Sequence, residues 1–168
     1  MEVGIVSTLE KHADDAKGQP EVRAAITKHL RRTKKHATAM KQALISHGRS
    51  HPVIREGISK IANLFAGIAI SAEKDTIVKN SITDFATEHF EIACYKSLTL
   101  TATELGEKKI AATCKAILKE EQAMANTLKS LFPSVNSAYL ATLDDEEAEK
   151  AQPEGCLSAP LRRRMNKA

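Results

Sequence analysis

Residues 107–132 read EKKIAATCKAILKEEQAMANTLKSLF, and this stretch decides the fold class. With a helical turn of about 100° per residue, its large apolar residues fall on one side of a helix. They are Ile110, Cys114, Ile117, Met124, Leu128 and Leu131. Glu121 falls near the centre of the same side, one turn from Ile117 and Met124. A carboxylate there is costly unless it is paired, protonated or bound to a metal, so Glu121 is the strongest chemical clue in the chain.

The rest of the chain divides into segments with the same helical periodicity, separated by Gly and Pro residues. We expect helices at about residues 2–17, 20–47, 52–69, 75–105 and 107–132, with a short one near 134–142. The segment 52–69 is short and contains Gly57 and Gly67, which suits a crossover between two antiparallel helix pairs. The prediction is an all-α four-helix bundle over residues 1–143, with a short crossover helix and a flexible tail, acidic and then basic, over 144–168.

Composition narrows the class of protein. Only seven of the 168 residues are Gly and five are Pro, which speaks against a β-sandwich or barrel, and the net charge of +4 does not indicate a nucleic-acid binder. The first 15 residues lack the pattern of a signal peptide, and the longest apolar run is shorter than the roughly 20 residues that span a bilayer. Three widely spaced Cys residues speak against a disulfide framework. We expect a cytoplasmic protein without a membrane role.

Polar residues also fall on the inward sides of the other helices. In 75–105 the apolar side consists of Val78, Ile82, Phe85, Ile92, Ala93 and Leu100. His89 lies within that side, Glu88 at its margin, and Glu91 is expected further outward. The apolar side of 20–47 includes His29, Thr33, His36 and His47, with Arg32 at its margin, and that of 2–17 includes Glu2 and His12. All four long helices therefore bring acids or imidazoles towards the predicted core.

Two interpretations account for these residues. In one, carboxylates and histidines from four helices surround a pair of divalent metal ions, as in ferritin-like di-iron bundles. In the other, they are hydrogen-bonded core residues, with His89, His36 and Arg32 pairing with Glu88 and Glu121.

Three stretches carry a family resemblance: EHFEIACYKSL at 88–98, KAILKEEQAMANTL at 115–128 and PEVRAAITKHLRRT at 20–33. Together with PVIREGISKIANL at 52–64 and DTIVKNSITDF at 75–85, they resemble the bacterial YciE/YciF family of ferritin-like stress proteins, and the YciE branch is the closer one. The resemblance covers roughly residues 1–143. It implies a ferritin-like bundle that is often dimeric and linked with stress responses, without an established activity.

The resemblance also suggests metal ligands, one position at a time. Glu2 matches the family's first-helix Glu, Glu88 the third-helix Glu, and Glu120-Glu121 the fourth-helix pair. A second-helix Glu of the family is replaced here by Arg32, which would put a positive charge where a cation would bind.

Two further positions depart from the pattern. Met124 stands where a ferritin-type Glu-x-x-His would place a histidine, and Asn126 replaces an Asp that family members often carry. His36, one turn beyond Arg32, could supply an imidazole instead. These departures predict a mononuclear or vacant site.

The leading hypothesis is a non-catalytic, stress-associated bundle with a weak metal site, present as a homodimer. The candidate ligands are Glu88, Glu121, His36 and Glu2, for iron or manganese. A first alternative is a di-iron or di-manganese protein that acts on oxidants. A second is an adaptor that binds an anionic partner through the basic face of the second helix, although nucleic acid is not the expected partner. The basic residues of that face are Arg23, Lys28, Arg31, Lys34, Lys35 and Lys41.

Overall fold

The computed structural model describes residues 2–46 and 75–150, and the elements in these ranges are all helical. They are α1 (Glu2–Asp15), a 3₁₀ turn η1 (Ala16–Gly18), α2 (Pro20–Ser46), α4 (Thr76–Glu104) and α5 (Lys108–Lys150). This confirms the all-α class and the four long helices. The expected crossover helix at 52–69 and residues 151–168 lie outside the described residues.

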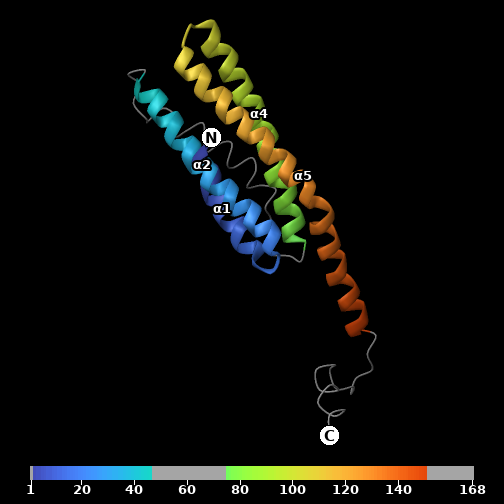
Figure 1. Ribbon diagram of the computed structural model, residues 1–168. Helices are drawn as coiled ribbons and strands as arrows, with labels where there is room; N and C mark the ends of the chain where they lie inside the picture. The colour runs from blue at the N-terminus through green and yellow to red at the C-terminus, as the bar shows by residue number, and fades with distance from the viewer. Residues whose placement is uncertain (1, 47–74, 151–168) are drawn as a thin grey trace.

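The four helices form two hairpins that pack together. α1 lies against α2 and α4 against α5, while α2 also contacts α5 and α1 contacts α4 (Figure 1). Each helix thus has two neighbours, which closes a four-helix bundle. The C-terminal part of α5 extends past the ends of the other helices (Figure 1).

The turn between α4 and α5 depends on a glycine. Gly106 has φ 72°, a left-handed conformation that a residue with a Cβ rarely adopts. It allows the N–H of Glu107 to donate to the Ala102 carbonyl at 2.8 Å and its own N–H to donate to Thr103 at 3.0 Å. These two bonds satisfy carbonyls at the end of α4 and reverse the chain in a Schellman turn.

α5 is one continuous helix, so the separate helix expected near 134–142 was wrong. Pro133 lies inside it and removes one backbone donor, at a cost of about 3 kcal/mol. On either side of the proline, Leu131 and Val135 are buried in the same apolar cluster, and their packing outweighs that cost. The helix ends at Lys150, past the boundary expected at residue 143.

Two apolar clusters enclose a polar layer. The larger cluster consists of Leu9, Ala16, Val22, Ile26, Leu131 and Val135. The smaller consists of Tyr95, Cys114 and Ile117. Along α5, Glu121 lies between the two clusters, and along α2 the buried residues that follow Ile26 are His29, Thr33 and His36. The polar side chains therefore occupy the middle of the bundle, where they can meet.

The inward face of α4 is not the one expected from its apolar residues. Ile82 is 53% exposed and Leu100 is 64% exposed, and His89 is also exposed. The buried residues are Asn80, Ser81, Thr83, Asp84, Thr87, Glu88, Glu91, Tyr95 and Ala102. Apolar periodicity does not predict the buried face of α4, because the residues on that face are polar and contact polar side chains of α1 and α2.

Candidate metal centre

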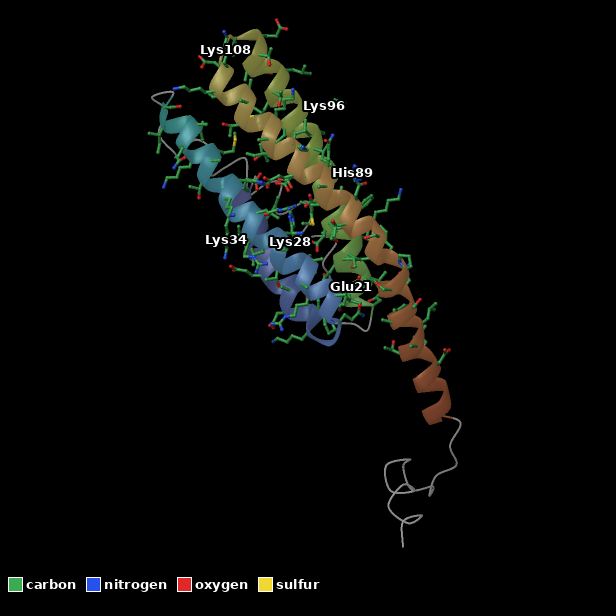
Figure 2. All side chains as sticks on the ribbon, in the orientation of Figure 1. Glu21, Lys28, Lys34, His89, Lys96 and Lys108 are labelled. Atoms are coloured by element: carbon green, nitrogen blue, oxygen red, sulfur yellow. The ribbon has the colours of Figure 1, made fainter. Side chains whose placement is uncertain are left out.

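Six buried acids and imidazoles form two groups of three in the polar layer. The Glu2 trio consists of Glu2, His36 and Glu121, and the His29 trio consists of His29, Glu88 and Glu91. Within each trio, one possible ligand atom from each residue lies within 4.8 Å of those of the other two. Each of the six residues is at most 4% exposed, and together they come from all four helices. Figure 2 shows side-chain oxygen and nitrogen atoms gathered between the two hairpins.

Helical spacing explains why these residues meet. His29 and His36 are seven residues apart, about two turns, so both point from α2 to the same side. Glu88 and Glu91 are three residues apart on α4, and neighbours at this spacing share a face. On α2 the two histidines therefore lie on one face but two turns apart, so that each of them belongs to a different trio.

The Glu2 trio is held by hydrogen bonds. His36 Nδ1 lies 2.8 Å from Glu121 Oε1, and His36 Nε2 lies 3.0 Å from Oε2 of the half-exposed Glu120. The Tyr95 hydroxyl donates to Glu2 Oε1. Burial disfavours the charged imidazole, but the bonds and charges of Glu121 and Glu120 outweigh it and raise the pKa of His36 to about 9. Burial also raises the pKa of Glu2.

The His29 trio has fewer partners. His29 Nε2 lies 2.6 Å from Glu88 Oε1, whereas neither oxygen of Glu91 has a hydrogen-bond partner among the described residues. Burial, followed by the charge of Glu121, raises the pKa of Glu88 to about 10. Burial, followed by the charge of Glu2, raises the pKa of Glu91 to about 11. Because each of these acids responds to the charge of a Glu2-trio residue, the two trios form one centre.

A further buried pair lies beside the His29 trio. His12 Nδ1 on α1 lies 2.7 Å from Asp84 Oδ1, and Asp84 is one helical turn before Glu88 on α4. One turn earlier again, the Asn80 amide donates to Asp15 at 2.8 Å. The inward face of α4 is therefore polar from the metal-ligand candidates down to the end of the bundle.

The sequence located four of the six residues. Glu2, His36 and Glu121 lie together in one trio, and Glu88 lies in the other. Glu91, expected to point outward, is fully buried. The signal that could have found it was its three-residue spacing from Glu88.

His29 is the other member of the two trios that was not named from the sequence as a candidate ligand. Its place on the apolar side of α2, two turns from His36, was the available signal. His89, expected on the inward side of α4, takes no part because it lies on the outer side of the helix (Figure 2).

Arg32 does not occupy the position expected for it. Its Nε lies 4.0 Å from Glu120 Oε2, near the surface, and among the described residues it forms no ion pair with Glu88 or Glu121. The cation that was expected to replace a metal is thus outside the two trios. Asn126 is exposed, so its change from the family's Asp also leaves the core unaffected.

The basic face of α2 is exposed, as expected for a surface that contacts solvent or a partner. Lys34 pairs with Glu10 at 2.8 Å. A hollow of about 500 Å³ next to the α1–α2 turn is lined by Lys17, Arg23 and Arg31, among others. No helix within residues 2–46 and 75–150 is both long enough and apolar enough to cross a bilayer.

Four helices that bury carboxylates and imidazoles at mid-height define the class of ferritin-like helical bundles. The chain belongs to the family described as Domain of unknown function (DUF892), whose match covers residues 1–141. The fold is shared with a protein from Xanthomonas campestris pv. campestris, known from a crystal structure. That protein is 23% identical, with a TM-score of 0.71 over 86% of this chain and 88% of its own. YcfI from Rhodopseudomonas palustris is 26% identical, with a TM-score of 0.58 over 76% of this chain and 83% of its own.

Proposed function

We propose that the two trios bind two divalent metal ions, iron or manganese, in the centre of the bundle. The donor set supports this proposal. Four carboxylates and two imidazoles, each buried, are the ligand types that ferritin-like di-metal bundles use. Their distribution over the helices is different here, because both histidines come from α2 and two of the four glutamates come from α4. The geometry therefore favours a dinuclear site over the degenerate one that the sequence predicted.

The observation that carries the proposal is the excess of buried acid. Among the described residues, neither oxygen of Glu91 has a hydrogen-bond partner, and Oε2 of Glu88 and Oε2 of Glu2 also lack one. A buried polar atom without a partner costs about 1–3 kcal/mol, so such a group calls for an explanation. Hydrogen bonding within the core satisfies His36 and Glu121 but leaves these acids unsatisfied.

Charge gives the same answer. If ionised, the four carboxylates carry a charge of −4, and only two imidazoles face them. Two divalent cations would bring the centre to neutrality and would bind the oxygens that have no donor. Without metal, Glu88 and Glu91 stay protonated, in agreement with their raised pKa values of about 10 and about 11.

The activity that we propose is reaction with oxidants, in keeping with the resemblance to the YciE/YciF family of stress proteins. Iron or manganese bound there would supply one-electron chemistry. The residues of the chain would hold the ions, exclude bulk water from a centre whose ligands are at most 4% exposed, and fix Glu2 through the Tyr95 hydroxyl. The support for the stress role is the set of sequence stretches that carry the resemblance.

Metal content by mass spectrometry tests the proposal. The untagged protein, purified without chelators and reloaded anaerobically with Fe(II) or Mn(II), should hold close to two ions per chain. Glu121→Gln and Glu91→Gln should each lose at least one ion, while the exposed Glu104→Gln should keep both. Less than one ion in the wild-type protein, or equal loading of all three variants, would contradict the dinuclear site.

We further propose that the protein forms a homodimer through the outer side of α4. Ile82 and Leu100 are 18 residues apart, about five helical turns, so both exposed side chains lie on the same side of the helix. That side is opposite to the buried polar face. A second copy packed along this side would remove both apolar side chains from water.

A further inference from the structure

Two buried atoms of complementary kind lack partners next to the His29 trio. His29 Nδ1 and Asp84 Oδ2 are both buried without a hydrogen-bond partner among the described residues. An imidazole nitrogen that carries a proton is a donor, and a carboxylate oxygen is an acceptor. The two residues lie on α2 and α4, the same two helices that bring His29 and Glu88 together.

The contacts of His29 fix which nitrogen faces the trio. Its Nε2 lies 2.6 Å from Glu88 Oε1, so Nε2 is the ligand candidate. An imidazole that binds a cation through Nε2 carries its proton on Nδ1. The Nδ1–H then requires an acceptor on the side away from the cation.

Asp84 offers that acceptor, although the two atoms are not hydrogen-bonded to each other in this structure. It is one turn from Glu88 on the inward face of α4 and is 4% exposed. His12 on α1 holds its Oδ1 at 2.7 Å, which leaves Oδ2 available.

We propose that Asp84 is a positioning residue for the metal ion of the His29 trio: when the ion binds, Asp84 accepts a hydrogen bond from His29 Nδ1–H and thereby directs His29 Nε2 at the ion. His12 anchors Asp84 from the opposite side, so three helices share the support. Histidine ligands in proteins almost always donate their second N–H to such a partner. The inference rests on the proposed dinuclear site and adds two residues, Asp84 and His12, that belong to neither trio.

Zinc is the probe for the test, because it is diamagnetic and accepts nitrogen and oxygen ligands. The full chain, labelled with ¹⁵N-histidine and loaded with Zn²⁺, is studied by long-range ¹H–¹⁵N NMR, which reports the protonated nitrogen of each ring. We expect His29 to be protonated at Nδ1 and bound to zinc through Nε2. In a zinc titration of Asp84→Asn, the affinity for one of the two ions should fall by about 10–100-fold, the usual effect of removing such a hydrogen-bond partner. Asp84→Leu, which has no acceptor, should lose at least as much.

Asn80→Ala is the matched control, since Asn80 is buried on the same face of α4, one turn further from the trio. It should leave both zinc affinities and the His29 signals unchanged. Unchanged zinc binding in Asp84→Leu, or equal weakening of both ions in the Asp84 variants, would overturn the role of Asp84 alone. Failure of the wild-type protein to bind two zinc ions would overturn the proposed site as well. If the variants do not fold, the wild-type spectrum decides: zinc on Nδ1 of His29 would refute the inference.

Discussion

His36 Nδ1 lies 2.8 Å from Glu121 Oε1, although 85 residues separate the two in the chain. The opposite ring nitrogen of His36 faces Glu120, the residue next to Glu121, at 3.0 Å. The side chain of Glu121 is 1% exposed and that of Glu120 is 50% exposed. His36 therefore spans from the buried centre to the surface, with one carboxylate at each end.

From this arrangement we predict that Glu120→Ala lowers the affinity of the Glu2 trio for its metal ion by roughly 10-fold or more without abolishing binding. The Nε2–H of His36 would lose its acceptor, and the ring would lose its fixed orientation. Competition titration with a chelator of known affinity measures the effect. Lys119→Ala, an exposed neighbour on α5, should match the wild-type protein, and an equal loss in that variant would point to a general effect on the helix.

The metal-free protein should become less stable as the pH rises from about 6.5 to about 9. The pKa values of Glu88 and Glu91 are raised to about 10 and about 11, so the folded state keeps protons that the unfolded state releases, and the free energy of unfolding falls with pH. The stability contributed by His36 is fully present below its ordinary pKa of 6.5 and is lost as the pH passes about 9. His29, whose pKa is lowered, acts in the opposite direction only below 6.5. Urea unfolding in the presence of chelator measures this slope, and a flat or rising profile would disprove it.

Glu91→Gln should reduce that pH dependence. Gln is neutral without taking up a proton, so the variant avoids the cost of keeping Glu91 protonated in the folded state. We expect the metal-free variant to be more stable than the wild-type protein by about 1–3 kcal/mol near neutral pH, with a gap that narrows towards pH 4.5, the ordinary pKa of Glu91. After loading with Mn(II), the wild-type protein should be more stable than the variant, because the variant lacks a ligand. Urea unfolding with and without metal gives both comparisons.

The difference between α5 and α4 shows what the sequence could predict. Around Glu121 the apolar residues outnumber the polar ones on the inward side, so helical periodicity located the buried face and the ligand candidate together. On α4 the residues that point inward are polar, and Ile82 and Leu100 lie on the outside. Burial on α4 depends on polar contacts with α1 and α2. These contacts cannot be predicted from the spacing of residues within α4 alone.

Arg32→Glu separates the sequence-based account from the structural one. If the arginine had replaced a metal ligand, restoring the acid would create or strengthen metal binding. Because Arg32 lies near the surface beside Glu120, we expect the same two ions per chain and a change in unfolding free energy within about 0.5 kcal/mol. Mass spectrometry and urea unfolding provide the two readings. A gain in metal content would show that position 32 reaches the centre after all.

The outer side of α4 predicts the oligomeric state. Charged residues cannot be buried in an apolar interface without a large desolvation cost, so the double variant Ile82→Lys, Leu100→Lys should be a monomer where the wild-type protein is a dimer. Light scattering after size-exclusion chromatography gives the mass. Both side chains are exposed in the single chain, so the helix content by circular dichroism should not change. Leu140→Lys, at a position on α5 that is 57% exposed, is the control and should keep the mass of the wild-type protein. A wild-type mass of one chain, or a dimer in the double variant, would rule out this face as the interface.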